Sequence, residues 1–184
     1  MTKSVTWAIA AAMVAALTGP AAAAASRGPD SFAGTCEVDG VLSFEGDGIG
    51  ALPEWGSWYY EGTGTCDGTL DGEAVAATPM TTRIDGVGYV GCLGSLMRGA
   101  TGTLSFSRGT QRRSDDASIG FTSGTYPAAL AKSAPWRAEG DVSGEFVGDT
   151  TFQVGPDDVE PCRVGQLNDV PTHISMRTVR PIVG

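Results

Sequence analysis

The chain has 184 residues and a formal net charge of −9 at pH 7, and 27 of its residues are glycine. Nucleic-acid binding needs clustered lysine and arginine to neutralise phosphates, so this acidic balance argues against a nucleic-acid partner. The basic cluster Arg108, Arg112 and Arg113 is followed at once by Asp115 and Asp116, and we interpret it as a solvated loop.

In chain order, the first 25 residues are typical of an export signal. Lys3 precedes the apolar run 7–17, and small residues then lead to Ala23, Ala24 and Ala25. We expect signal peptidase to cut after Ala25, which leaves a single secreted β domain over residues 26–184. The apolar run is shorter than the roughly 20 residues needed to cross a bilayer, and no later segment is apolar enough. The sequence therefore predicts an extracellular protein without a transmembrane segment.

All four cysteines lie beyond the predicted signal. Their even number in an exported chain predicts two disulfides. We favour Cys36 with Cys66 and Cys92 with Cys162, although four cysteines permit three pairings. A zinc site is the competing interpretation, but the chain has no C-x-x-C spacing and its only histidine is the distant His173. The sequence therefore predicts no metal site.

Alternation of apolar and polar residues begins at residue 32. The runs 32–44 and 58–70 each place apolar residues and glycines on one parity and polar residues on the other, which is typical of half-buried strands. Cys36 and Cys66 both fall on the apolar parity, so we expect both to face the same interior.

Shorter alternating runs follow, separated by turn residues. They lie at about 80–85, 87–97, 101–108, 117–125, 136–147, 150–154, 162–167 and 172–180. The one candidate helix is 126–132. About ten short strands without intervening helices predict an all-β fold, an antiparallel barrel or sandwich.

Glycine recurs on the inward parity of these strands, where it ordinarily weakens a sheet. Large aromatic side chains on neighbouring strands could cover such glycines. The inward glycines are Gly34, Gly62, Gly64, Gly102, Gly140 and Gly144, and the candidate covers are Trp58, Tyr60, Phe106, Phe121, Trp136 and Phe146. Because large and tiny interior residues alternate, we favour a closed or nearly closed barrel over a flat sandwich.

The motif Phe32-x-Gly34-x-Cys36, followed by Gly62-x-Gly64-x-Cys66, resembles a pattern in secreted, disulfide-bonded, β-rich actinobacterial proteins of unassigned function. The resemblance covers the first half of the processed chain at most. It implies no catalytic residue.

We predict no catalytic residue from the sequence itself. His173 is expected to face solvent on a C-terminal strand, and the chain has no G-x-S-x-G motif for a nucleophilic serine. A glycoside hydrolase needs two carboxylates at a fixed separation. Glu37, Glu61, Glu139 and Glu145 occupy outward positions typical of solubilising residues, so a carboxylate-based glycoside hydrolase is the less favoured alternative.

Acidic residues in two turns invite a comparison with calcium sites. Glu45 and Asp47 lie in the first of these turns, and Asp157, Asp158 and Glu160 lie in the second. Neither turn matches the twelve-residue helix-loop-helix calcium pattern. We interpret both as acidic turns that need no ion.

An aromatic group carries the functional prediction. Trp58, Tyr60 and Trp136 point inward, Tyr59 points outward, and Trp55 lies in the preceding loop as either a ligand platform or a plug over the barrel end. We predict a secreted or envelope-associated non-catalytic binding module. Its most specific form is a small ligand-holding barrel in which these five residues bind the ligand. The alternative is a protein-interaction or structural envelope module. The expected partner is a small molecule, a glycan or an envelope protein, and no cofactor is predicted.

Overall fold

The computed structural model describes residues 30–107, 117–128 and 134–184. The predicted signal peptide and the basic cluster at 108–113 lie outside these residues. Within these ranges the fold consists of nine strands and one short helix. They are β1 (Ser31–Phe44), β2 (Glu54–Leu70), β3 (Glu73–Val90), β4 (Ser95–Phe106), β5 (Ala117–Ser123), β6 (Tyr126–Ala128), β7 (Ala134–Gly140), β8 (Ser143–Phe152), the 3-10 turn Pro156–Asp158, α1 (Val159–Val164) and β9 (Asp169–Val183).

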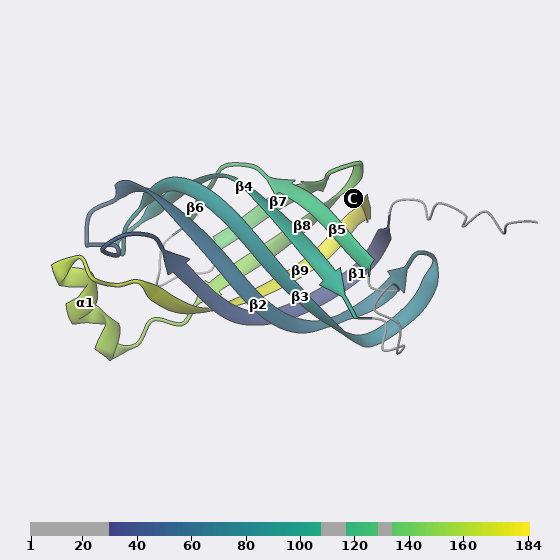
Figure 1. The fold of residues 1–184 in the computed structure, drawn as a ribbon, viewed down its shortest axis with the longest axis horizontal. Coiled ribbons are helices and arrows are strands. Elements are labelled where there is room, and N and C mark those ends of the chain that lie inside the picture. The colour runs from purple at the N-terminus through teal and green to yellow at the C-terminus, as the bar shows by residue number, and fades with distance from the viewer. Residues whose placement is uncertain (1–29, 108–116, 129–133) are drawn as a thin grey trace, which may run out of the picture.

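Eight of the strands form a closed antiparallel ring, which Figure 1 shows as an elongated barrel. Each strand pairs with its neighbour along the chain, from β1 through β5 to β7, β8 and β9, and β1 pairs with β9 to complete the ring. The three residues of β6 pair with β4 beyond the end of β5. The predicted all-β fold is confirmed, and its form is a barrel.

Several predicted boundaries are wrong. The strands are fewer and longer than expected. The run 80–85 and the start of the run 87–97 both lie in β3, which continues through Gly86 to Val90, whereas residues 95–97 belong to β4. The run 136–147 is divided between β7 and β8 by a turn after Gly140. The expected strand at 162–167 is replaced by α1 and its C-cap Gly165, which adopts the left-handed conformation that glycine adopts freely. The predicted helix at 126–132 begins instead as β6, and residues 129–133 are not described.

Both predicted disulfides are present. Cys36 and Cys66 lie directly opposite each other on β1 and β2, and both are fully buried. Cys92, between β3 and β4, is joined to Cys162 on α1. The first bond therefore lies within the barrel wall, and the second ties the helix to a hairpin at one end of the barrel.

That end, at the left in Figure 1, is covered by two connecting segments, residues 45–53 and 153–168. Ile49 and Leu167 pair with each other there, and both side chains are buried. The backbone N–H of Cys92 donates to the carbonyl of Gly50 at 2.9 Å. We call this the α1 end of the barrel. Within the described ranges, no helix has the length and apolar character needed to cross a membrane.

Large inward side chains lie against glycines on the next strand, as the alternation of sizes predicted. A Cβ atom placed on Gly102 would lie 2.3 Å from the Phe121 ring, and one on Gly86 would lie 2.3 Å from the Trp58 indole. Phe121 pairs with Gly102 across β4 and β5, and Trp58 pairs with Gly86 across β2 and β3. These rings fill space that any larger residue would occupy.

Other inward glycines serve a different purpose from the one predicted. At Gly34, Gly64 and Gly144, a Cβ atom would lie about 2.0 Å from a backbone carbonyl oxygen of the neighbouring strand rather than against an aromatic ring. These glycines therefore permit close approach of two backbones.

Candidate functional site

The barrel interior contains a small cavity at the α1 end. Its volume is about 20 Å³, which is room for about one water molecule. The lining combines apolar, aromatic and hydroxyl-bearing side chains from eight strands and β6. They are Leu42, Trp58, Tyr60, Ile84, Met97, Phe121, Ser123, Tyr126, Trp136, Thr150, Phe152, Thr172 and Ile174.

The cavity brings together three of the five predicted ligand-binding residues, Trp58, Tyr60 and Trp136. All three are buried on the inward parity of β2 or β7, as expected. Tyr59 lies on the outer surface, as expected, and Trp55 lies there as well. Trp55 belongs to β2, so its predicted place in the preceding loop is wrong. Its role as a ligand platform stays a prediction.

Most polar groups around the cavity already have partners. The Trp136 Nε1–H donates to the Thr150 Oγ1 at 3.0 Å, and the Tyr60 hydroxyl donates to the Val38 carbonyl at 3.3 Å. Ser123 Oγ accepts a bond from the Ala100 N–H at 3.1 Å.

The indole N–H of Trp58 is the exception. Trp58 is only 3% exposed, and its indole nitrogen is buried without a hydrogen-bond partner in the described part of the chain. Buried donors in native proteins almost always have a partner, because leaving one unpaired costs about 1–3 kcal/mol. The Trp58 N–H is therefore a candidate contact for a ligand atom that accepts a hydrogen bond.

The site is electrically neutral. None of the lining residues that the structure describes is charged. Burial raises the pKa of the Tyr126 hydroxyl, and burial followed by the negative charge of Asp39 raises that of Tyr60. Both phenols therefore stay protonated at physiological pH. The arrangement can hold an uncharged molecule by packing and hydrogen bonding, but it places no base beside a nucleophile.

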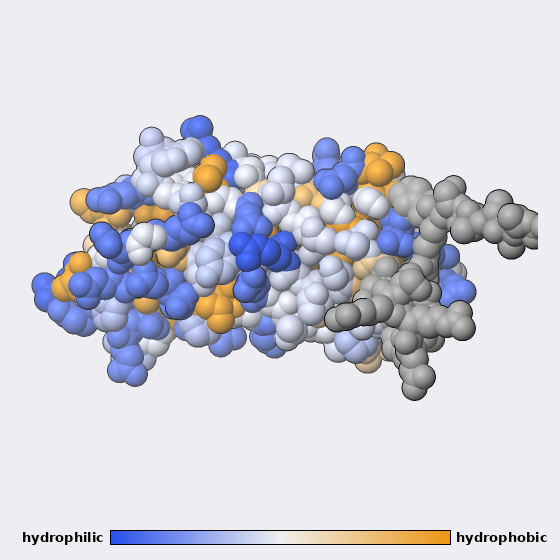
Figure 2. Space-filling model, in the orientation of Figure 1, coloured by the Kyte–Doolittle hydropathy of each residue, from blue (hydrophilic) through white to orange (hydrophobic). Residues whose placement is uncertain are grey.

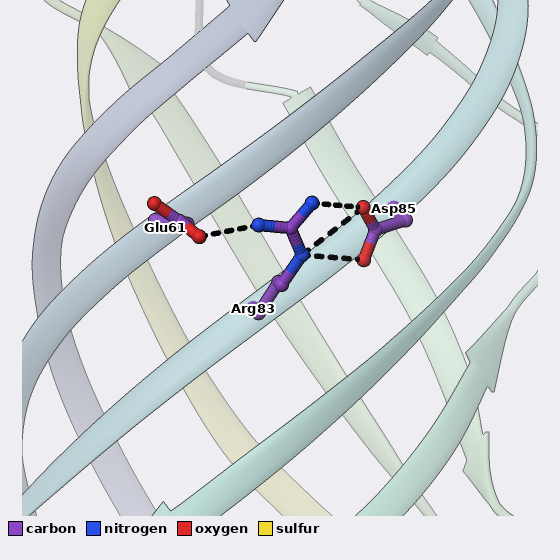
Figure 3. A network of polar contacts seen from close by, with 3 residues as sticks. All are labelled: Glu61, Arg83 and Asp85. Carbon is purple, nitrogen blue, oxygen red and sulfur yellow. Dashed lines mark hydrogen bonds and ion pairs between the residues drawn. The ribbon is translucent and has the colours of Figure 1, made fainter.

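Charged groups are on the outside of the barrel. Arg83 on β3 donates to both carboxylate oxygens of Asp85, at 2.8 and 3.0 Å, and also to Glu61 on β2 (Figure 3). The bonds to Asp85 and then to Glu61 raise the pKa of the Arg83 guanidinium. Its central carbon also lies 4.9 Å from the centroid of the Tyr59 ring.

His173 lies on the outer surface of β9 as expected, and it has two acidic partners. Nδ1 is 2.8 Å from Asp39 Oδ1, and Nε2 is 2.9 Å from Glu37 Oε2. The hydrogen bond to Asp39 is the first cause that raises the His173 pKa, and the bond to Glu37 adds to it. Both imidazole nitrogens are engaged, so this geometry leaves neither nitrogen available to activate a nucleophile.

The outward carboxylates considered for glycoside hydrolysis lie on the barrel surface and outside the cavity. Glu61 pairs with Arg83, and Glu145 pairs with Arg137 at 2.5 Å. In the described ranges, no group of three or more histidine, cysteine, aspartate or glutamate residues is arranged to hold a metal ion.

Comparisons with protein-family models, with curated proteins and with solved structures found no match to this chain. The site is therefore characterised by its geometry.

Sequence reasoning missed several lining residues. Ser123, Thr150 and Thr172 are buried hydroxyl residues, and residue type alone does not distinguish them from surface threonines and serines. Tyr126 falls in the predicted helix 126–132, which obscured its place in the lining. The parity of residues 150 and 152 was the available signal, since it places Thr150 and Phe152 on the same face.

Proposed function

We propose that the protein is a secreted, non-catalytic binding module that holds a small uncharged ligand at the α1 end of the barrel. The observation that carries the proposal is the buried Trp58 N–H, for which the described residues offer no acceptor, beside an aromatic and hydroxyl-lined cavity. An eight-stranded barrel has an interior just wide enough to be filled by side chains or to hold one small ligand.

The cavity volume sets a condition on the ligand. Because about 20 Å³ admits about one water molecule, a larger ligand must displace side chains as it enters. Met97 lines the cavity and has an unbranched, flexible side chain that can adopt other rotamers. The proposed ligand is therefore small and mostly apolar, with one acceptor atom for the Trp58 N–H.

The two disulfides support the extracellular part of the proposal, because disulfides persist in oxidising compartments. The neutral lining supports a binding role over a hydrolytic one, since carboxylate-based hydrolysis needs two acidic groups at the reacting bond.

The proposal is tested by following the indole N–H resonances of the processed protein in ¹H–¹⁵N NMR spectra. Trp7 lies in the predicted signal, so Trp55, Trp58 and Trp136 contribute the signals, which Trp→Phe variants assign. Cyclohexanone and benzamide serve as neutral probes that carry a carbonyl acceptor, and benzene serves as the matched probe without one. We expect the carbonyl probes to shift the Trp58 signal and to leave that of Trp55 unchanged.

Trp58→Phe should weaken binding of the carbonyl probes but not of benzene, because it keeps a ring and removes the donor. Trp136→Phe is the matched control, since that N–H already donates to Thr150. Native mass spectra of protein from its producing culture, compared with denaturing spectra, would reveal a natural ligand as a noncovalent adduct. The proposal is wrong if no probe moves the Trp58 signal and the native spectrum shows only the bare chain.

A further inference from the structure

The outer surface of β2, β3 and β4 carries exposed aromatic residues near the α1 end. Trp55 on β2 lies opposite Tyr89 on β3, and Tyr89 lies opposite Leu96 on β4. The Trp55 and Tyr89 rings meet edge to face, with centroids 5.3 Å apart, and the two residues remain 56% and 46% exposed. Rigid, exposed rings of this kind offer a large contact area at little entropic cost.

Farther along the same strands, the Arg83 network supplies polar groups in fixed positions. Figure 3 shows Arg83 between Glu61 and Asp85, with the guanidinium reaching a carboxylate on each side. The Tyr59 ring contacts the same guanidinium. Since these side chains are already held by one another, a ligand that binds them has less conformational entropy to remove.

Surface grooves flank Arg83. One has a volume of about 480 Å³ and the other about 230 Å³, and both include Arg83 and Thr103 in their lining. Hydroxyl-bearing residues also line them, Thr63, Thr81 and Ser105 in the larger groove and Thr101 in the smaller one. Carboxylates lie beside them, Asp39 and Glu61 in the larger groove and Asp85 and Asp141 in the smaller one. A hydroxyl group both donates and accepts, so these grooves match a ligand that is itself rich in hydroxyls.

The character of the surface narrows the choice of partner. Figure 2 shows that the face crossed by β2 and β3 is mainly hydrophilic to neutral, with hydrophobic residues in small separate groups. A protein-protein interface would more often show a larger contiguous apolar patch. The net charge of −9 disfavours polyanions. Sugars instead offer apolar ring faces for stacking and hydroxyls for hydrogen bonds, without charge.

The geometry points to a second binding surface, the outer face of β2, β3 and β4 from Trp55 to Arg83, that takes an extended uncharged glycan. From the row of Trp55 to the row of Glu61 is six residues of strand, or about 20 Å, which is longer than a single sugar. This surface is separate from the interior cavity and does not depend on the ligand proposed there.

Affinity electrophoresis of the folded, processed protein tests the inference. Dextran, mannan and arabinoxylan serve as neutral probes, and heparin serves as the polyanion. We expect at least one neutral polysaccharide to retard the protein and heparin to have no effect. Trp55→Ala and Thr103→Val should each weaken the retarding interaction at least tenfold, because one removes a stacking ring and the other a groove hydroxyl.

Val179→Ala is the matched control, since Val179 is 48% exposed on β9 and away from these strands. Near-UV circular dichroism confirms that each variant is folded. Trp58→Phe should leave glycan retardation unchanged, which separates this surface from the interior site. Retardation by heparin alone, the absence of retardation on all three neutral polysaccharides, or equal retardation of Trp55→Ala and the wild type would each overturn the inference.

Discussion

Trp58 and Trp136 occupy equivalent places in two hairpins of the barrel, β2–β3 and β7–β8. Each indole lies against the glycine directly opposite on the next strand, Gly86 for Trp58 and Gly148 for Trp136. Both side chains are buried, and both line the cavity at the α1 end. Each hairpin therefore packs an inward indole against a glycine of its paired strand.

They differ two residues farther along the receiving strand. In the β7–β8 hairpin that position is Thr150, which accepts the Trp136 N–H. In the β2–β3 hairpin it is Gly88, which has no side chain. A Cβ atom on Gly88 would lie 2.4 Å from the Leu96 carbonyl oxygen, so β4 leaves no space for an acceptor there. The Trp136 N–H therefore has an acceptor within the barrel, and the Trp58 N–H has none among the described residues.

The rule that a buried donor has a hydrogen-bond partner is kept at Trp136 and broken at Trp58, in otherwise matched surroundings. Broken rules in native proteins concentrate at functional or strained sites. This contrast supports the proposal that Trp58, rather than Trp136, contacts a ligand.

The largest expected effect comes from placing a methyl group under either indole. In Gly86→Ala or Gly148→Ala the new Cβ would lie 2.3 or 2.5 Å from the ring, so the ring must move. We expect each variant to lose about 1–3 kcal/mol of unfolding free energy, with Gly148→Ala losing more because its ring also leaves Thr150. Urea unfolding measures both, with Gly94→Ala, where the added Cβ meets open space, as the control. Equal stability of all three variants and the wild type would refute the shared packing device.

Thr150→Val should remove the difference between the two tryptophans. The valine keeps the volume but leaves the Trp136 N–H without its acceptor, which we expect to cost about 1–3 kcal/mol. Thr151→Val, on the outward parity of β8, is the control. Adding Trp136→Phe to Thr150→Val should recover part of the loss, since it removes the stranded donor. If Thr150→Val proves as stable as the wild type, this hydrogen bond does not distinguish the two sites.

His173 extends the comparison to a ring on the outer surface, where water competes for its N–H groups. Its pKa is raised by Asp39 and Glu37, so its contribution to stability is fully present below the ordinary histidine pKa of 6.5 and is lost as the pH rises through the folded value. The His173 side chain is 34% exposed, and its partners are 63% and 79% exposed, so we expect less than about 1 kcal/mol.

The measurement is the unfolding free energy of the wild type and of His173→Gln between pH 5 and 9. The difference between them should be largest at pH 5 and shrink toward pH 9. A difference that grows with pH would contradict this sign.

Much of the fold follows from the sequence because alternation is a local signal. The parity of residues 32–44 and 58–70 places Cys36 and Cys66 on the inner face, and it places Trp58 and Tyr60 in the interior in the same way. The helix α1 was also within reach, since Pro156 near its start and Gly165 at its end are typical boundary residues.

The remaining features depend on register. Which residue lies across from Trp58, and which from Trp136, is set by strand pairings that contain bulges, such as the shifts at Cys66/Gly68 and Asp85/Val87. A single strand pattern carries no information about its neighbour's register. The Thr150 acceptor, the Gly88 gap and the contact of Trp55 with Tyr89 were therefore beyond prediction.

The seam between β1 and β9 governs when the barrel can form. Ser31 pairs with Val183 and Ser43 with Asp169, so this seam joins opposite ends of the described chain. The other neighbours in the ring follow one another along the chain, with only the short β6 between β5 and β7. A chain that emerges from its N-terminus has β1 early and β9 last. Until β9 arrives, β1 and β8 present open edges that can recruit other strands. The last fifteen residues of strand in this chain therefore decide whether the meander closes on itself or associates with its copies.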